Sequence, residues 1–209
     1  MMRKKHFVFD VDDTLIDSYA INQQLFVKTF SEHLNLSNLK IDKYLHELHF
    51  RSRGKSMISQ FEEAVTYFSL SINPLELVRH NEKLQLNNTI RHRLFDSVKE
   101  LFGKLSDQGK KISVCTNRPT KSLLKILKGQ DIQKYLTNII SCHDAGHEKP
   151  DPYCLNKLID ESGEPKEDFI YFGDSITDYK FAMNAGIDFI IIDYYLNQKF
   201  YKLIVESFI

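Results

Sequence analysis

The chain is poor in cysteine, carries no excess of charge of either sign and lacks any long apolar run. Its three cysteines, Cys115, Cys142 and Cys154, are an odd number without CxxC spacing, which argues against a disulfide framework and fits a reducing compartment. The 28 basic residues are balanced by 28 acidic ones, for a formal net charge of +0. This balance argues against binding to a nucleic acid polymer, which would need a concentrated basic surface.

The first apolar stretch is too short for a signal peptide or a membrane span. Basic residues at positions 3–5 precede the mostly apolar residues 6–9, as they would in a signal peptide. Asp10 then interrupts the stretch, far short of a signal-peptide core or of the roughly 20 residues that cross a bilayer. We therefore expect a cytoplasmic protein without a membrane partner.

The rest of the composition is that of a globular protein with an α/β fold. Hydrophobic residues make up 42% of the 209 residues, and 15 Phe and 10 Tyr supply large side chains for a core. Five apolar runs, separated by helical patterns, each have the length of a strand buried on both faces: 7–9, 111–115, 138–142, 169–172 and 189–192. Strands that alternate with helices predict a doubly wound parallel sheet.

The segment between the first two apolar runs has a different pattern. From about residue 16 to residue 90 no strand pattern occurs, and apolar residues recur at the spacing of four amphipathic helices. The sequence therefore predicts two domains. One is an α/β core domain of residues 1–16 and 91–209, and the other is an inserted helical cap domain of residues 17–90.

Three aspartates, Asp10, Asp12 and Asp13, directly follow the first predicted strand. In an open parallel sheet, ligands bind at the carboxyl ends of the strands. Carboxylates crowded there repel one another unless a cation neutralises them, and Mg²⁺ prefers oxygen ligands. The pattern predicts a magnesium site, with a turn and a helix cap as the alternative explanation.

Polar side chains also follow three later predicted strands. They supply a hydroxyl, an amide, basic groups and further acids: Thr116, Asn117 and Arg118 after the second strand, Lys149 after the third, and Asp174 and Asp178 after the fourth. Because the strands are parallel, these groups are expected to converge on one edge of the sheet. Electrostatic stabilisation of a phosphoryl group requires such a mixture.

Four of these segments resemble, in order, the four motifs of the haloacid dehalogenase superfamily: DVDDTLIDS at 10–18, TNRP at 116–119, KPDP at 149–152 and GDSITD at 173–178. The helical insert after the first motif resembles the C1-type cap of the phosphoglycolate phosphatase and β-phosphoglucomutase branch. One departure is Asp13, where many relatives have glycine. That difference concerns the turn and leaves the reacting carboxylates unchanged.

The resemblance implies a nucleophile and an acid/base. Asp10 would attack phosphorus to form an aspartyl phosphate, and Asp12 would protonate the leaving oxygen and then deprotonate the hydrolytic water. Thr116 and the backbone of Asn117 would hold phosphoryl oxygens, and Lys149 would neutralise negative charge. Dehalogenases of the superfamily lack the second aspartate, so its presence favours phosphoryl transfer.

The resemblance also implies a Mg²⁺ site. Asp10, the carbonyl of Asp12 and Asp174 would bind the ion, while Asp178 would orient its surroundings. The charges of these four aspartates would be balanced by Mg²⁺, by Lys149 and by a proton on Asp12. Removal of Mg²⁺ is therefore expected to abolish turnover.

These implications predict a Mg²⁺-dependent phosphatase that acts on a small phosphorylated metabolite, as a monomer or a homodimer. One alternative is a phosphomutase that returns the phosphoryl group to a sugar, which the motifs do not distinguish from a phosphatase. Another is a non-catalytic protein that binds phosphate or a partner. That alternative predicts a broken motif, and none is broken.

Two groups of residues have open roles in the sequence. Arg51, Arg53 and Lys55 in the insert either grip an anionic substrate or form a solvated positive turn. Arg118 either touches phosphate or pairs with a nearby carboxylate. A third group, His143 and His147 beside Cys142, has the spacing of zinc ligands, but Gly146 makes the segment a loop and we expect no metal there.

Overall fold

The structure is a computed structural model that describes residues 4–34, 39–88, 92–192, 201–202 and 204. The chain divides into two compact units. The sheet unit comprises Met1–Asp17 and His92–Ile209, and the helical unit comprises Ser18–Arg91. Each unit is described by itself below.

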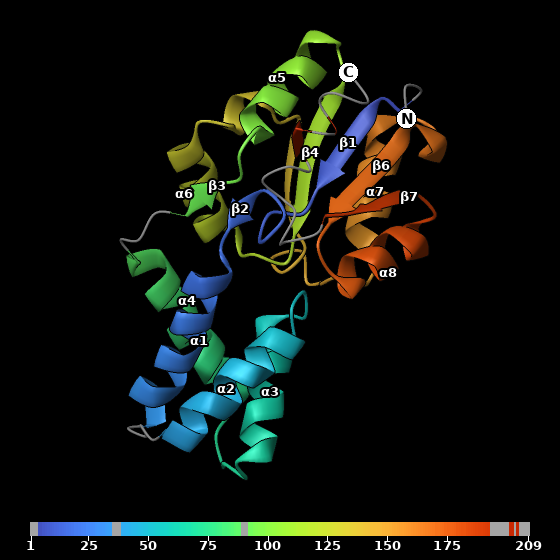
Figure 1. The fold of residues 1–209 in the computed structure, drawn as a ribbon. Coiled ribbons are helices and arrows are strands. Elements are labelled where there is room, and N and C mark those ends of the chain that lie inside the picture. The colour runs from blue at the N-terminus through green and yellow to red at the C-terminus, as the bar shows by residue number, and fades with distance from the viewer. Residues whose placement is uncertain (1–3, 35–38, 89–91, 193–200, 203, 205–209) are drawn as a thin grey trace. The chain divides into compact units, whose positions relative to one another are not determined.

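A five-stranded parallel sheet forms the centre of the sheet unit (Figure 1). The strand order is β5-β4-β1-β6-β7. The strands are β1 (His6–Phe9), β4 (Lys111–Thr116), β5 (Asn138–Ser141), β6 (Phe169–Gly173) and β7 (Asp188–Ile191). All five correspond to the apolar runs of the sequence, so the predicted doubly wound α/β fold is confirmed.

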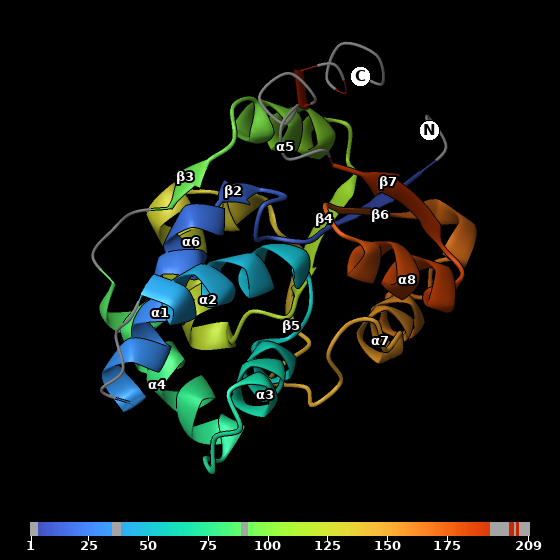
Figure 2. The same cartoon turned by 60° about the horizontal axis from the view of Figure 1, so that its bottom comes forward.

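Helices cover both faces of this sheet (Figure 2). Successive side chains of a strand point to opposite faces, so Phe7 and Phe9 of β1 enter one core while Val8 enters the other. The first core contains residues of α5 (Val98–Asp107) and α6 (Thr120–Gln130), and the second contains residues of α7 (Tyr153–Ser162) and α8 (Ile176–Ala185). Both faces of β1 are therefore buried, which explains its uninterrupted apolar sequence.

Short elements complete the sheet unit. An antiparallel pair joins β2 (Ile16–Asp17) to β3 (Arg93–Leu94), on either side of the helical insert. The sequence did not predict this pair, because two residues are too few to show a period. Two short 3₁₀ helices, η1 (Gln133–Tyr135) and η2 (Lys166–Asp168), precede β5 and β6.

Within residues 18–34 and 39–88, which the structure describes, the helical unit contains four α-helices, the number that the sequence predicts. They are α1 (Tyr19–Leu34), α2 (Leu39–Arg51), α3 (Met57–Tyr67) and α4 (Pro74–Asn87). Their apolar faces meet in a core centred on Phe26, Phe30, Leu45, Leu48 and Phe61. Ser56 and Asn73 cap α3 and α4, each with its side chain accepting a hydrogen bond from a backbone N–H of the first turn.

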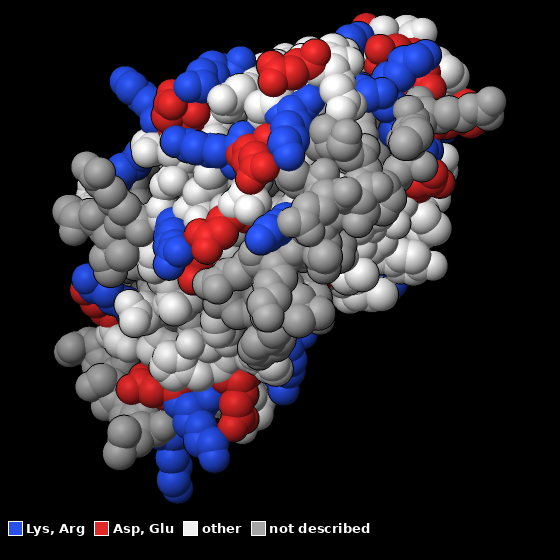
Figure 3. All heavy atoms as spheres, turned by 45° about the horizontal axis from the view of Figure 1, so that its top comes forward, with Lys and Arg blue, Asp and Glu red and all other residues white. Residues whose placement is uncertain are grey.

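Charge is mixed over the described surface in Figure 3, where Lys and Arg alternate with Asp and Glu. Among the helices of the described residues, none combines the length and the apolar character that a membrane span requires.

Candidate active site

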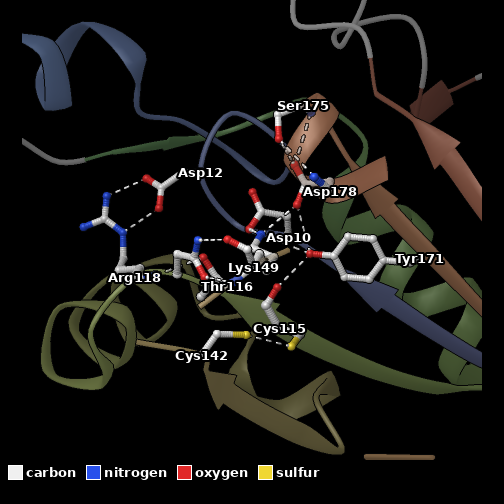
Figure 4. Close-up of polar contacts among 11 residues, drawn as sticks. Asp10, Asp12, Cys115, Thr116, Arg118, Cys142, Lys149, Tyr171, Ser175 and Asp178 are labelled. Carbon is white, nitrogen blue, oxygen red and sulfur yellow. Dashed lines mark hydrogen bonds and ion pairs between the residues drawn. The ribbon is translucent and has the colours of Figure 1, made fainter. Parts of the chain in front are cut away.

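A buried lysine joins two carboxylates at the carboxyl edge of the sheet (Figure 4). Asp10 directly follows β1, and Lys149 lies in the loop between β5 and α7. The Nζ of Lys149 donates hydrogen bonds to Oδ1 of Asp10 at 2.6 Å and to Oδ1 of Asp178 at 2.7 Å. All three residues are buried, so the ion pairs are shielded from the screening that weakens surface pairs.

Burial and neighbouring charges shift the pKa values of this pair. Burial raises the pKa of Asp10 to about 7, with Lys149 opposing the shift and Asp178 and Asp12 adding to it. Burial alone would lower the pKa of Lys149, but the carboxylates of Asp10 and Asp178 raise it well above its usual value. Lys149 therefore stays charged and supplies a fixed positive charge beside Asp10.

Asp178 is held from both sides. It belongs to a capping box at the start of α8, in which Oγ and N–H of Ser175 donate to its Oδ2 while its own N–H donates to Ser175 Oγ. Its carboxylate lies close against Gly173, where an added Cβ would be 2.4 Å from the Cβ of Asp178. The GDSITD segment thus needs both its glycine and its serine to place Asp178 on Lys149.

Tyr171 is a member of this network that the sequence analysis missed. Its hydroxyl accepts from Lys149 Nζ at 3.1 Å and donates to the carbonyl of Cys115 at 2.8 Å. The available signal was a polar hydroxyl in the otherwise apolar strand β6, since a buried tyrosine hydroxyl requires a partner.

The donor set fits a divalent cation. Carboxylate oxygens of Asp10, Asp174 and Asp178 lie within 4.8 Å of one another, and oxygen ligands suit Mg²⁺. With Lys149 as the counter-charge, these three carboxylates lack two positive charges, which one divalent ion would supply. Asp178 already accepts from Lys149 and Ser175, which agrees with an orienting role rather than a binding one.

The side chain of Asp12 lies against Arg118. Arg118 donates from Nε to Asp12 Oδ2 at 2.8 Å and from Nη2 to Oδ1 at 2.5 Å. Of the two roles that the sequence left open for Arg118, the structure shows the pairing with a carboxylate. The expected charge balance was incomplete because it omitted Arg118. With Arg118 included, Mg²⁺ and the two cations match the charge of the four aspartates, so a proton on Asp12 would leave the group with one net positive charge.

The segment after β4 is hydrogen-bonded to the loop that carries Lys149. The Asn117 side chain accepts from the Lys149 N–H at 2.8 Å and donates to the Lys149 carbonyl at 3.4 Å. Thr116 is buried, and its Oγ1 accepts from the Arg118 N–H at 3.3 Å. The sequence assigned phosphoryl binding to Thr116 and to the Asn117 backbone, but it gave no role to the Asn117 side chain, which holds the backbone of Lys149.

Asp13 adopts the left-handed backbone conformation, with φ of 56°. This region favours glycine and is tolerated by aspartate and asparagine. The difference from the many relatives with glycine is therefore one of turn chemistry, as the sequence analysis inferred.

The basic residues of the insert lie at the end of α2 and in the loop to α3. Arg51 and Lys55 both pair with Glu63 of α3, at 2.5 and 3.5 Å, and the Arg53 guanidinium lies 5.7 Å from the centre of the Tyr19 ring. The Gln60 side chain donates to the Lys55 carbonyl at 3.2 Å. The loop thus has a defined conformation, and its role in substrate binding stays a prediction.

The cysteines and the histidine pair belong to the fold. Cys115 and Cys142 are fully buried thiols with their sulfur atoms 3.4 Å apart, and they pack as small core residues. His143 pairs with Glu148, and His147 pairs with Asp151.

Together, the parallel sheet and the lysine-bridged carboxylates after its strands define an α/β protein with an acidic cluster at the carboxyl edge of its sheet. The family model of haloacid dehalogenase-like hydrolases matches residues 7–192. The chain therefore belongs to this family of enzymes, and the resemblance read from the four motifs is confirmed.

Three comparisons illustrate the relationship. The proposed pyrophosphatase PpaX of Caldanaerobacter subterraneus is 25% identical over 187 residues, which cover 86% of this chain and 77% of that protein. A phosphoglycolate phosphatase of Rhodospirillum rubrum is 30% identical over 94 residues, 45% of this chain and 39% of that protein, so the match spans less than half of its length.

The third is a solved structure, that of the proposed hydrolase YfnB from Bacillus subtilis, which is bound to magnesium. It has a TM-score of 0.68 at 20% identity and covers 91% of this chain and 87% of that one. At this level of identity the comparison shows the shared fold.

Proposed function

We propose that the protein is a Mg²⁺-dependent phosphatase that hydrolyses a small phosphorylated metabolite through a phosphorylated Asp10. The observation that carries the proposal is the placement of Lys149 between Asp10 and Asp178, with an oxygen of Asp174 within 4.8 Å of both carboxylates. The phosphatases among the relatives support the same reaction class.

Asp10 acts as the nucleophile. An ionised carboxylate needs no deprotonation before attack, and Lys149 favours this form of Asp10 and fixes one of its oxygens. A bond forms between a carboxylate oxygen of Asp10 and phosphorus while the bond from phosphorus to the leaving oxygen breaks. The positive charge of Lys149 lies where negative charge gathers during this transfer.

Asp12 acts as the acid and then as the base. It donates a proton to the leaving oxygen, because an alkoxide is a poor leaving group. It then accepts a proton from the water that attacks the phosphorylated Asp10, and inorganic phosphate is released. Asp12 is partly exposed, with 27% of its side chain accessible, so it can meet both the substrate and water.

Asp10 and Asp174, with the Asp12 carbonyl, would hold the cation. When bound, Mg²⁺ neutralises the carboxylates and lets a phosphate dianion approach them. The magnesium bound by YfnB supports this choice of ion.

We further propose that the helical unit covers the site during turnover and that Arg51, Arg53 or Lys55 contacts the non-reacting part of the substrate. The insert leaves the sheet unit seven residues after Asp10, which is the place of a cap in the family that it resembles. A closed cap would exclude bulk water before the first transfer.

Hydrolysis of p-nitrophenyl phosphate with and without Mg²⁺ tests the function. Turnover is expected with Mg²⁺ and is expected to disappear on addition of a chelator. The Asp10→Asn variant should lose more than about a thousandfold in turnover while its circular dichroism spectrum stays unchanged. No turnover by the wild-type protein under any metal condition would refute the function, and wild-type turnover by Asp10→Asn would refute the nucleophile.

A further inference from the structure

We propose that Arg118 is a positioning residue that holds the carboxylate of Asp12 for proton transfer to the leaving oxygen. The inference rests on the proposed phosphatase function and adds a residue to its machinery.

Two hydrogen bonds define the contact between Arg118 and Asp12. The guanidinium meets both carboxylate oxygens, through Nε at 2.8 Å and Nη2 at 2.5 Å. A planar guanidinium that binds a carboxylate at two points fixes both its position and the plane of its oxygens. A single point charge such as an ammonium would fix only the distance.

Burial makes this contact rigid on one side. The Arg118 side chain is 4% exposed, whereas that of Asp12 is 27% exposed. The Arg118 backbone N–H also donates to Oγ1 of Thr116, at the end of β4. Arg118 is thus fixed to the sheet, and Asp12 is held by a buried partner while part of it faces outward.

The geometry separates the roles of the two aspartates (Figure 4). Asp10 points to Lys149 and Asp178, whereas Asp12 points to Arg118. Each carboxylate therefore accepts hydrogen bonds from a different cation, and Arg118 would act on the reaction through Asp12. For the transfer, Oδ2 of Asp12 stays bonded to Nε, while Oδ1 exchanges its hydrogen bond from Nη2 for the proton that it passes to the leaving oxygen.

Leaving groups of different basicity distinguish this role from phosphate binding. Nitrophenolate leaves as a stable anion and depends little on an acid, whereas an alkoxide requires a proton. Loss of a residue that positions the acid should therefore slow an alkyl phosphate more than an aryl phosphate. Loss of a residue that binds phosphate should slow both equally.

The experiment compares kcat/KM for p-nitrophenyl phosphate and for glycerol 2-phosphate at saturating Mg²⁺. Arg118→Met is expected to lower the value about hundredfold for the alkyl ester and only a few-fold for the aryl ester. Arg118→Lys should recover part of the alkyl activity, since it keeps the charge but not the two-point contact. Lys134→Met is the matched control, because it removes an exposed pair with Asp131 and should change neither value.

A double-mutant cycle tests the path through Asp12. In an Asp12→Asn background, the first burst of nitrophenolate should be no slower when Arg118→Met is added. A further large loss there, or equal losses for the two esters in the single variant, would overturn the inference and leave the phosphatase function standing.

Two further outcomes are also informative. If the circular dichroism spectrum shows that Arg118→Met does not fold, Arg118→Lys takes its place. A larger loss of kcat/KM for the alkyl ester than for the aryl ester then supports the inference, and equal losses overturn it. A wild-type protein that hydrolyses neither ester with Mg²⁺ would overturn the proposed function and the inference together.

Discussion

Lys149 Nζ lies 2.6 Å from Asp10 Oδ1, although the two residues are 139 positions apart in the chain. The contact forms because β1 is a central strand and the loop after β5 crosses the same edge of the sheet. It makes the acidic edge compatible with burial, since an isolated buried carboxylate would be strongly unfavourable.

Replacement of Lys149 should therefore destabilise the fold as well as the reaction. Lys149→Met leaves Asp10 and Asp178 buried without their shared cation, and we expect a loss of about 3 to 5 kcal/mol in the free energy of unfolding. Urea denaturation without divalent ions measures it. Mg²⁺ should restore part of the loss, because it supplies positive charge to the same carboxylates. Unchanged stability in metal-free buffer would contradict the assigned ion pairs.

Gly173→Ala should disturb Asp178. The new Cβ would lie 2.4 Å from the Cβ of Asp178, so the start of α8 must shift and Asp178 must leave Lys149. We expect a stability loss of about 1 to 3 kcal/mol together with a large loss of turnover.

The matched control for that substitution is Gly103→Ala in α5. Nothing lies within 4 Å of the Cβ that it would add. It should raise stability by about 0.5 to 1 kcal/mol, because alanine favours the helix. Equal changes in stability and turnover for the two substitutions would show that the close approach of Gly173 to Asp178 does not constrain the site.

His6 should make the fold sensitive to acid. Burial lowers the pKa of His6 below 6.5, with the pair to Glu164 opposing the shift and Lys111 adding to it. The unfolded chain therefore binds the proton more readily, so this contribution to stability is complete above about pH 6.5 and is lost as the pH falls through the lowered folded-state pKa.

The measurement is the free energy of unfolding between pH 7.5 and 5. His6→Gln retains a polar partner for Ser113, which lies 2.8 Å from His6 Nε2, but cannot titrate. The variant should lose less stability than the wild-type protein over this range. His46→Gln, at an exposed position, is the control and should follow the wild-type curve. A His6→Gln curve parallel to the wild-type one would rule out this histidine as the source.

Binding of Mg²⁺ alone should stabilise the protein. Binding to the folded state at about one hundred times the dissociation constant adds about 2.7 kcal/mol, which thermal unfolding would detect. Asp174→Asn should weaken this stabilisation. Asp131→Asn, at an exposed position with the same charge change, should not. A magnesium-dependent shift that survives Asp174→Asn unchanged would place the ion elsewhere.

The sequence was sufficient to predict the helices and strands whose apolar residues recur in a regular pattern. The apolar run Phe7–Phe9 predicts a doubly covered strand because both faces of β1 need apolar side chains. The paired strands β2 and β3 could not be predicted, since Ile16 and Leu94 are brought together only by the fold.

The residues of the candidate site also fall into two groups, those that the sequence predicts and those that it does not. Asp10, Lys149 and Asp174 each follow a predicted strand, so topology alone places them at one edge. The partner of Arg118 could not be chosen from the sequence, because side-chain direction decides between Asp12 and a phosphate. The hydroxyl of Tyr171 and the side-chain amide of Asn117 were missed for the same reason. Their roles depend on hydrogen bonds to groups that are distant in sequence.

The pairing of Asp17 with Arg93 brings the two ends of the insert next to each other. Residues 18–91 therefore leave and rejoin the sheet unit at adjacent points, next to the strand pair β2–β3. Such an insert can be lengthened, exchanged or excised without changing the path of any strand. The arrangement allows the insert to change in sequence and length while the residues of the sheet edge keep their positions.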